Sequence, residues 1–337
     1  MRDPERWATM QDVAREAGVS TMTVSRALTA PDKVAAETRE RVNGAVARLG
    51  YVPDQSAGSL SSRNTRLVTA LISTLGGSVF AETAAGLMRT LRDANCQLLL
   101  GATDYSQESE EELISAALGR RPVGVVLTSE HHTPDAQRKL RRAHVPVVEI
   151  WELPDDPIDM AVGFSNHAAG WRMTQFLHEL GYRRIATMGQ RGPADARGQR
   201  RQQGYADAMR ALGLGAPRIV PDDGGCTPIE AGARGLVALR ERWPDTDAVF
   251  CTSDAGALGA VSEARRRGLA TPGDIAIAGF GDFDYAGPAG LDLTTLRVPG
   301  FRMGEEAGRL LLARQAGEIS GPCMVNVGFE PVRRATA

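Results

Sequence analysis

The chain has 337 residues, enough for two or three domains, and its 39 lysines and arginines against 41 acidic residues give a formal net charge of −2. Its 4 cysteines are far apart with no CxxC or metal-ligand spacing, and no run of about 18 apolar residues predicts a membrane span. Since the amino-terminus also lacks an apolar signal region, this composition excludes a disulfide-stapled or integral membrane protein and predicts a cytoplasmic one.

Residues 9–29 have the spacing of a helix-turn-helix. Thr9 followed by Asp12 is a capping-box pattern that starts a helix, and Gly18 tolerates the positive φ of a tight helix-ending turn. Ser20 can cap a second helix. Pairs one turn apart supply the two buried faces: Val13 with Ala17, and Val24 with Leu28. The outward face then carries residues that suit the major groove of DNA: Thr21, Met22, Ser25 and Arg26.

A third helix is predicted from an apolar stripe that stops at Gly50: Thr38, Val42, Ala45, Val46 and Leu49. Three helices around one small core predict an all-α headpiece over residues 9–53. For the first two helices alone, the alternative is a helical hairpin with no role in DNA binding. The charge of the headpiece is nearly balanced, so it lacks the strongly basic footprint of many DNA-binding domains.

Residues 54–65 are small and polar, as expected of a hinge. Beyond them, short apolar runs alternate with helical stretches. The expected strands are 67–72, 97–102, 124–128, 145–150, 184–188, 248–252 and 274–279. The expected helices are 81–94, 108–118, 168–180, 199–212, 231–242, 255–267 and 303–315. This alternation predicts doubly wound parallel sheets, and because it has too many units for one sheet, we expect two α/β lobes over residues 66–337 with a ligand cleft between them.

No motif predicts catalysis. Gly279-Phe-Gly281 follows a late predicted strand but lacks the third glycine of a dinucleotide-binding turn. His131 and His132 are adjacent, which is poor spacing for two ligands of one metal. P-loop, HExxH and GxSxG motifs do not occur in the sequence. We therefore expect neither an enzyme nor a bound metal or cofactor.

Three groups of residues, in this order, resemble the lactose/galactose repressor family: 12–26, Glu37-Thr-Arg-Glu-Arg-Val42, and Leu49-Gly-Tyr-Val-Pro53 with Ala57-Gly-Ser-Leu60. The resemblance covers nearly the whole chain. It implies a helix-turn-helix headpiece joined to a two-lobed effector domain like the periplasmic binding proteins, with about three crossings between the lobes. The N-lobe is then expected near 66–167 and 298–325, and the C-lobe near 168–297 and 326–337. No heptad segment follows the core, so a homodimer is expected.

The resemblance also implies how DNA is read. Thr21, Met22 and Arg26 match base-reading positions, and Arg26 is expected to pair with guanine. Leu60 matches a leucine that wedges into the minor groove at the operator centre. Residues that match backbone or groove-edge contacts are Ser20, Thr23, Ser25, Thr29, Lys33, Thr38 and Tyr51. Ala35 stands where the family usually has a serine that caps the third helix.

A second set of residues is expected to bind the effector. Arg201 matches the family's effector-binding arginine, although an arginine on a helix surface is the alternative. A guanidinium in a cleft suits a carboxylate or a vicinal diol. Phe80 matches an aromatic side chain of the ligand site, with a core phenylalanine as the alternative. Ser253 matches a polar ligand contact, whereas Asp254 is expected to orient backbone.

Glu149 and Asp282 complete the candidate ligand-binding set. Many sugar-binding relatives have an aspartate at the position of Gly281. Its absence is expected to favour an anionic ligand, because one source of repulsion is removed.

Further segments resemble the gluconate-utilisation repressors of this family, among them Val79-Phe-Ala-Glu82, Pro146-Val-Val-Glu149 and Ala276-Ile-Ala-Gly-Phe280. The expected protein is a repressor in the cytoplasm, associated with the nucleoid. A sugar acid, with gluconate as first candidate, is expected to release it from a palindromic operator in double-stranded DNA. The alternatives are a neutral-sugar effector, a co-repressor, or a periplasmic-type sugar-binding protein, against which the helix-turn-helix argues.

Overall fold

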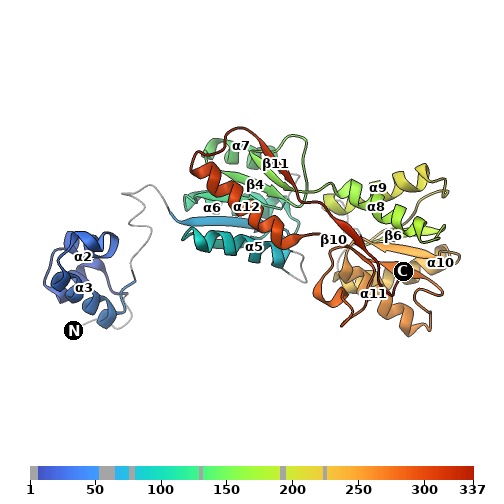
Figure 1. The fold of residues 1–337 in the computed structure, drawn as a ribbon, viewed down its shortest axis with the longest axis horizontal. Helices are drawn as coiled ribbons and strands as arrows, with labels where there is room; N and C mark the ends of the chain where they lie inside the picture. The colour runs from blue at the N-terminus through green and yellow to red at the C-terminus, as the bar shows by residue number, and fades with distance from the viewer. Residues whose placement is uncertain (1–6, 53–64, 76–79, 129–131, 190–194, 223–225) are drawn as a thin grey trace. The chain divides into compact units, whose positions relative to one another are not determined.

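The computed structural model describes residues 7–52, 65–75, 80–128, 132–189, 195–222 and 226–337. The chain divides into two compact units, Met1–Thr65 and Arg66–Ala337 (Figure 1). Within the described ranges, no helix is both long and apolar enough to cross a membrane. The expected minor-groove wedge, Leu60, lies outside the described residues.

The first unit is a small helical domain whose turns are set by local capping. Its elements are α1 (Met10–Ala17), α2 (Thr21–Thr29), the 3-10 helix η1 (Pro31–Lys33) and α3 (Ala36–Leu49). Thr9 and Asp12 form the predicted capping box, and Gly18 ends α1 with a φ of 63°. Ala35 precedes α3 without a side-chain cap. The helices pack around a buried core of Val13, Ala14, Ala17, Val24, Ala27, Val42, Ala45 and Tyr51.

The second unit contains a six-stranded parallel sheet in the order β11-β5-β4-β3-β1-β2. Its strands are β1 (Leu67–Ile72), β2 (Gln97–Ala102), β3 (Gly124–Leu127), β4 (Val147–Ile150), β5 (Met160–Gly163) and β11 (Cys323–Asn326). Helices α5 (Phe80–Asp93) and α12 (Gly300–Gln315) pack on one face, and α6 (Gln107–Gly119) and α7 (Pro134–Ala143) on the other. We call this layered body the first lobe.

The second lobe is built on a four-stranded parallel sheet in the order β7-β6-β8-β9. Its strands are β6 (Ile185–Met188), β7 (Arg218–Val220), β8 (Ala248–Cys251) and β9 (Ala276–Ala278). Helices α8 (Asn166–Glu179) and α9 (Ala196–Ala211) cover one face, and α10 (Pro228–Arg242) and α11 (Asp254–Arg266) the other. The 3-10 helix η2 (Asp284–Ala286) follows β9.

The chain passes between the lobes three times, as the sequence of elements shows. It leaves the first sheet after β5, returns through β10 (Thr295–Arg297) to α12 and β11, and ends in β12 (Glu330–Val332), which pairs antiparallel with β10. The two-lobed, doubly wound architecture that the β-α alternation predicted is therefore confirmed.

Several short elements differ from the sequence-based prediction. Strands β5, β7, β10, β11 and β12 were not predicted, and they have only 3 or 4 residues, too few for a periodic signal. Helix α7 was not predicted because charged residues dominate it and its buried side chains are only Ala136 and Leu140. Thr133 caps this helix and Pro134 occupies its first position, so its start was nevertheless encoded locally.

Candidate functional site

Helix α2 presents a single exposed face beside a buried one. The Ser20 hydroxyl accepts a hydrogen bond from the Thr23 amide at 3.2 Å, which fixes the start of the helix. Val24 and Ala27 are buried in the domain core, and Thr21, Met22 and Arg26 are exposed. The Met22 side chain is 70% exposed, which is unusual for a large apolar residue and suits a contact with a base methyl group.

The residues expected to contact the DNA backbone differ in exposure and in the hydrogen bonds they form within the headpiece. Ser20, Thr29 and Lys33 are exposed, and Thr23, Ser25 and Thr38 are half-buried. The Ser20 and Thr23 hydroxyls lie 2.9 Å apart, and the Thr29 hydroxyl donates to the Ser25 carbonyl oxygen at 2.8 Å. Tyr51 is different, because its side chain belongs to the core of the headpiece and is only 7% exposed.

Arg197, near the start of α9, links the two lobes. Its Nη2 donates to Ser73 Oγ at 2.7 Å, its Nη1 donates to the Thr128 carbonyl oxygen, and its guanidinium lies 5.2 Å from the centre of the Phe80 ring. Ser73 and Thr128 directly follow β1 and β3, and their hydroxyls are 2.9 Å apart. Carboxyl ends of parallel strands are the usual place for a ligand in such folds, so Arg197 lies where an effector is expected.

Arg201 lies one turn further along α9 and is also buried. Its guanidinium lies 4.3 Å from the centre of the Phe280 ring, and its Nη1 donates to Asn166 Oδ1. The amide nitrogen of Asn166 in turn donates to the Trp151 carbonyl oxygen at 2.7 Å and to Glu152 Oε2 at 3.0 Å. Arg201 is therefore held by second-lobe groups, one of which, Asn166, is itself bonded to Trp151 and Glu152, and it is not a surface arginine.

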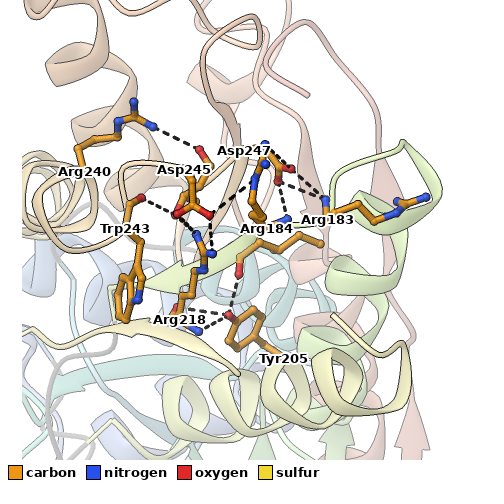
Figure 2. Close-up of polar contacts among 10 residues, drawn as sticks. Arg183, Arg184, Tyr205, Arg218, Arg240, Trp243, Asp245 and Asp247 are labelled. Carbon is orange, nitrogen blue, oxygen red and sulfur yellow. Dashed lines mark hydrogen bonds and ion pairs between the residues drawn. The ribbon is translucent and has the colours of Figure 1, made fainter. Parts of the chain in front are cut away.

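Helix α9 is fixed to the second sheet by Tyr205 (Figure 2). The buried Tyr205 hydroxyl donates to the Ile185 carbonyl oxygen and accepts from the Arg218 amide, both at 2.8 Å. Burial raises the pKa of this phenol to about 12, so it stays a neutral donor. Arg218 also forms a bidentate ion pair with Asp245, at 2.8 and 2.9 Å.

Close backbone packing positions α9 as well. A Cβ atom at Gly170 of α8 would lie 1.9 Å from the Arg201 carbonyl oxygen, so only glycine allows the two helices to approach this closely. Arg197 and Arg201 thus project from a helix with little freedom to move.

Aromatic rings join the two arginines across the lobes. Phe80 meets Trp151 edge to face at a centroid distance of 5.4 Å, Trp151 meets Phe164 at 6.0 Å, and Phe164 meets Phe280 at 6.0 Å. Phe80 is therefore a core residue whose ring lies under Arg197, and its contact with a ligand stays a prediction.

A cavity of about 220 Å³ opens beside these rings; we call it the interlobe cavity. Residues from both lobes line it, including Glu82, Trp151, Asp282, Phe283, Asp284 and Tyr285. Burial raises the pKa of Glu82, and the charges of Asp284 and Asp282 raise it further. Gly281 also lines this cavity, together with three carboxylates, so the preference for an anionic ligand that was expected from Gly281 stays a prediction.

Asp282 lies on the cavity wall but its carboxylate is already paired. It is 2.6 Å from Arg297 and 2.6 Å from Arg334, and its side chain is 8% exposed. Burial alone would raise the pKa of Asp282, but the ion pairs with Arg334 and Arg297 outweigh it and hold the pKa below its usual value. The role of Asp282 visible here is to join β10 and the chain end to the cavity wall.

Glu149 lies in the interior of the first lobe and not among the residues that line the interlobe cavity. His132 Nδ1 is 2.6 Å from Glu110 Oε1, and His132 Nε2 is 3.3 Å from Glu149 Oε1. Glu149 also accepts from the Ile158 amide at 2.7 Å. The structure thus assigns Glu149 to a buried cluster with Glu110 and His132, in place of the expected ligand contact.

Ser253 and Asp254 organise the loops at the carboxyl ends of β8 and β9. The Ser253 hydroxyl caps α11 by accepting from the Gly256 amide at 3.1 Å. The fully buried Asp254 accepts from the Phe283 amide at 2.8 Å and from the Thr295 hydroxyl at 2.5 Å. Burial is the main cause that raises the pKa of Asp254 to about 6. Asp254 orients backbone, as the sequence predicted.

Sequence reasoning did not name Arg197, Asn166 or Glu82 as individual binding residues. The signal for Arg197 was its spacing of four residues from Arg201 on one helix, which brings both side chains to the same face. Asn166 and Glu82 carried no comparable signal, because their partners lie far away in the sequence.

Two family models match the chain: bacterial regulatory proteins of the lacI family over residues 9–54, and a periplasmic binding protein-like domain over residues 174–337. The HTH-type transcriptional regulator GntR of Escherichia coli K12 is 35% identical over 320 residues, covering 95% of this chain and 96% of that protein. The regulator IdnR of the same organism is 33% identical, with the same coverage.

A solved structure gives the same picture. The LacI-family transcriptional regulator of Silicibacter pomeroyi superposes with a TM-score of 0.88 at 32% identity, covering 98% of this chain and 99% of that one. Neither this match nor the two sequence relatives are enzymes by description, and α2 presents the exposed face that a DNA-reading helix requires. The chain belongs to the lacI family of bacterial regulatory proteins and is a DNA-binding transcriptional regulator.

Proposed function

We propose that the protein is a homodimeric repressor that a small sugar acid, with gluconate as first candidate, releases from a palindromic operator. The observation that carries this proposal is the pair Arg197 and Arg201. Both guanidiniums are buried, stacked on aromatic rings, and located at the carboxyl ends of the strands. Guanidinium groups in such a site suit a carboxylate, which they bind with two parallel hydrogen bonds.

The groups near the interlobe cavity support a ligand with two kinds of polar group. Arg197 and Arg201 lie on the rings of Phe80 and Phe280, outside the lining of the cavity, whereas Glu82 and Asp284 are among the residues that line it. Carboxylates accept hydrogen bonds from hydroxyl groups, so this lining suits a polyol chain. A sugar acid carries both kinds of group, and the resemblance to the gluconate-utilisation repressors points to the same class.

In this proposal the effector lowers the affinity for the operator, because the effector itself binds more tightly to the state of the protein that does not bind DNA. Arg197 bridges the lobes through Ser73 and Thr128, so a ligand that competes for this guanidinium changes how the lobes are joined. The homodimer would read the two half-sites with two copies of α2, in which Arg26 contacts guanine and Thr21 and Met22 contact neighbouring bases. Leu60 would wedge into the minor groove.

We take residues 9–53, 54–65 and 66–337 as the headpiece, hinge and effector domain, and the cytoplasm as the place where the protein meets chromosomal DNA. Keto-gluconates and idonate-like acids are close alternatives to gluconate. A neutral sugar is a second candidate, favoured by the carboxylates of the interlobe cavity. A co-repressor would bind in the same cavity but would raise the affinity for operator DNA instead of lowering it.

The test is the thermal midpoint of the pure protein with gluconate, keto-gluconates, neutral hexoses and purines. A ligand at about 100 times its dissociation constant stabilises the folded state by roughly 2.7 kcal/mol. A shift with sugar acids alone, followed by loss of operator binding in their presence, supports the proposal. A shift with neutral hexoses or purines alone contradicts the assignment of Arg197 and Arg201 to a carboxylate.

A further inference from the structure

Arginines gather along one edge of the six-stranded sheet. Strands β4, β3, β1 and β2 are neighbours and parallel, so they all begin at the same edge, which is opposite to the edge that carries Ser73 and Thr128. The segments leading into them are residues 141–146, 120–123, 65–66 and 92–96. They carry six arginines and one acid: Arg66, Arg92, Arg120, Arg121, Arg141 and Arg142 against Asp93. We call these six arginines the basic edge.

The basic edge is open to solvent, since all six side chains belong to exposed residues. Arg141 approaches Asp156 at 3.4 Å and Arg120 donates to the Ala116 carbonyl oxygen at 2.9 Å. Within the described ranges, no hydrogen bond or ion pair engages the guanidinium of Arg92 or Arg142. Their charges are therefore available to a partner.

Helix dipoles explain only part of this pattern. A cation in the last turn of a helix is favourable, and α5, α6 and α7 all end at this edge. The same argument does not explain why acids are almost absent from four adjacent segments. The acids of this edge lie further along it, before β5 and β11, at Asp155, Asp156, Asp159 and Glu318. The sheet edge is thus polarised along its length.

The covalent link to the helix-turn-helix indicates which partner the basic edge can reach. Arg66 directly precedes β1, so residues 53–64, which lead to the helix-turn-helix, attach to the second unit at the basic edge. A segment of about 12 residues spans at most roughly 40 Å when extended. Any DNA held by α2 is therefore tethered within a few nanometres of these arginines.

The headpiece itself has little charge for DNA. Its described residues 7–52 contain six basic and five acidic side chains, a net charge of only +1. Phosphate contacts provide most of the sequence-independent affinity of DNA-binding proteins. The four segments of the basic edge carry a net charge of +5 over a width of four strands, roughly 15 Å. This is the size and sign of surface that a DNA backbone requires.

We propose that the basic edge of the effector domain binds DNA phosphates beside the site read by α2. It supplies sequence-independent attraction that the nearly neutral headpiece lacks. Because phosphates carry no base identity, the contact raises affinity for all DNA equally and leaves the preference for operator unchanged.

The test compares two double variants of the full-length chain on a 40-bp duplex of random sequence, by fluorescence anisotropy between about 50 and 200 mM KCl. Arg92→Gln/Arg142→Gln removes two charges from the basic edge. Arg265→Gln/Arg333→Gln removes two exposed charges from the second lobe and is the matched control. Equal thermal midpoints establish that both variants are folded.

If both mutated arginines contact phosphates, the slope of log K against log [KCl] falls by roughly 1.8 per protomer in the basic-edge variant, and it is unchanged in the control. Equal slopes in wild type and basic-edge variant overturn the proposal. An equal fall in both variants also overturns it, because overall charge would then be the cause. Selective loss of binding to anionic phospholipid vesicles, with the DNA slope intact, would reassign the basic edge to a membrane surface.

Discussion

The buried cluster of Glu110, His132 and Glu149 makes a prediction about pH. The side chains of His132, Glu110 and Glu149 are 1%, 4% and 6% exposed. Burial lowers the pKa of His132, but the hydrogen bonds and charges of Glu110 and Glu149 outweigh it and raise the pKa to about 9. The ring is therefore a cation at neutral pH, shared between two carboxylates.

The contribution of this cluster to the free energy of unfolding follows from the pKa of His132, which is about 9 in the folded chain and 6.5 for an ordinary histidine. At about 1.4 kcal/mol per pKa unit, it corresponds to roughly 3 kcal/mol. Since the folded state binds this proton more tightly, the stabilisation is complete below about pH 6.5 and is lost as the pH rises through 9. We expect the free energy of unfolding to fall by about this amount across that range.

Urea unfolding between pH 6.5 and 9.5 measures the effect, with tryptophan fluorescence as the signal because Trp151 is buried in the same lobe. His132→Gln should remove most of the pH dependence and destabilise the protein at pH 7 by about 3–5 kcal/mol, because two buried carboxylates lose their cation. His144→Gln, which removes an exposed histidine, is the control and should keep the wild-type slope. A His132→Gln protein with the wild-type slope would refute this reasoning.

Three further variants test the two candidate sites and the headpiece. Arg201→Ala should abolish the thermal shift with the effector while operator binding persists in an anisotropy assay; an undiminished shift would show that the ligand does not use this guanidinium. Arg26→Ala should lower operator affinity by about 1–3 kcal/mol per half-site, the value of a bidentate guanine contact, and thus reduce discrimination against random DNA. Equal losses on both duplexes would mean that Arg26 touches only phosphate. Ala35→Ser should supply the missing cap of α3 and stabilise the headpiece by about 1 kcal/mol in thermal unfolding; an unchanged midpoint would show that the end of α3 does not limit its stability.

Local signals made the headpiece predictable. The Thr9 capping box, Gly18 and the Ser20 cap act within three or four residues of chain, and each appears in the structure as the sequence predicted. The alternation of strands and helices likewise predicted the two lobes. The five strands that were missed, β5, β7, β10, β11 and β12, have 3 or 4 residues and gain their stability from neighbours in the sheet, which no local pattern records.

The effector site was less predictable because its geometry depends on distant pairs. Asp282 was expected to meet a ligand, but its charge is taken by Arg297 and Arg334, 15 and 52 residues away. Glu149 meets His132 from a neighbouring strand end. Such pairings exist only once the sheets have formed, so a polar residue at a strand end is equally consistent with a ligand contact and with an internal ion pair.

The same strands connect the interlobe cavity to the basic edge. Strand β1 runs between Arg66 and Ser73, and β3 between Arg121 and Thr128, each spanning roughly 25 Å across the first lobe. At their carboxyl ends, Arg197 of the second lobe holds both strands through Ser73 and Thr128. Strands packed within a sheet move as rigid elements, because every backbone group is bonded to a neighbour. In the mechanism proposed above, a ligand that changes the bonding of Arg197 acts on the two strands that begin at the basic edge, and these strands are the expected path of coupling from effector to DNA.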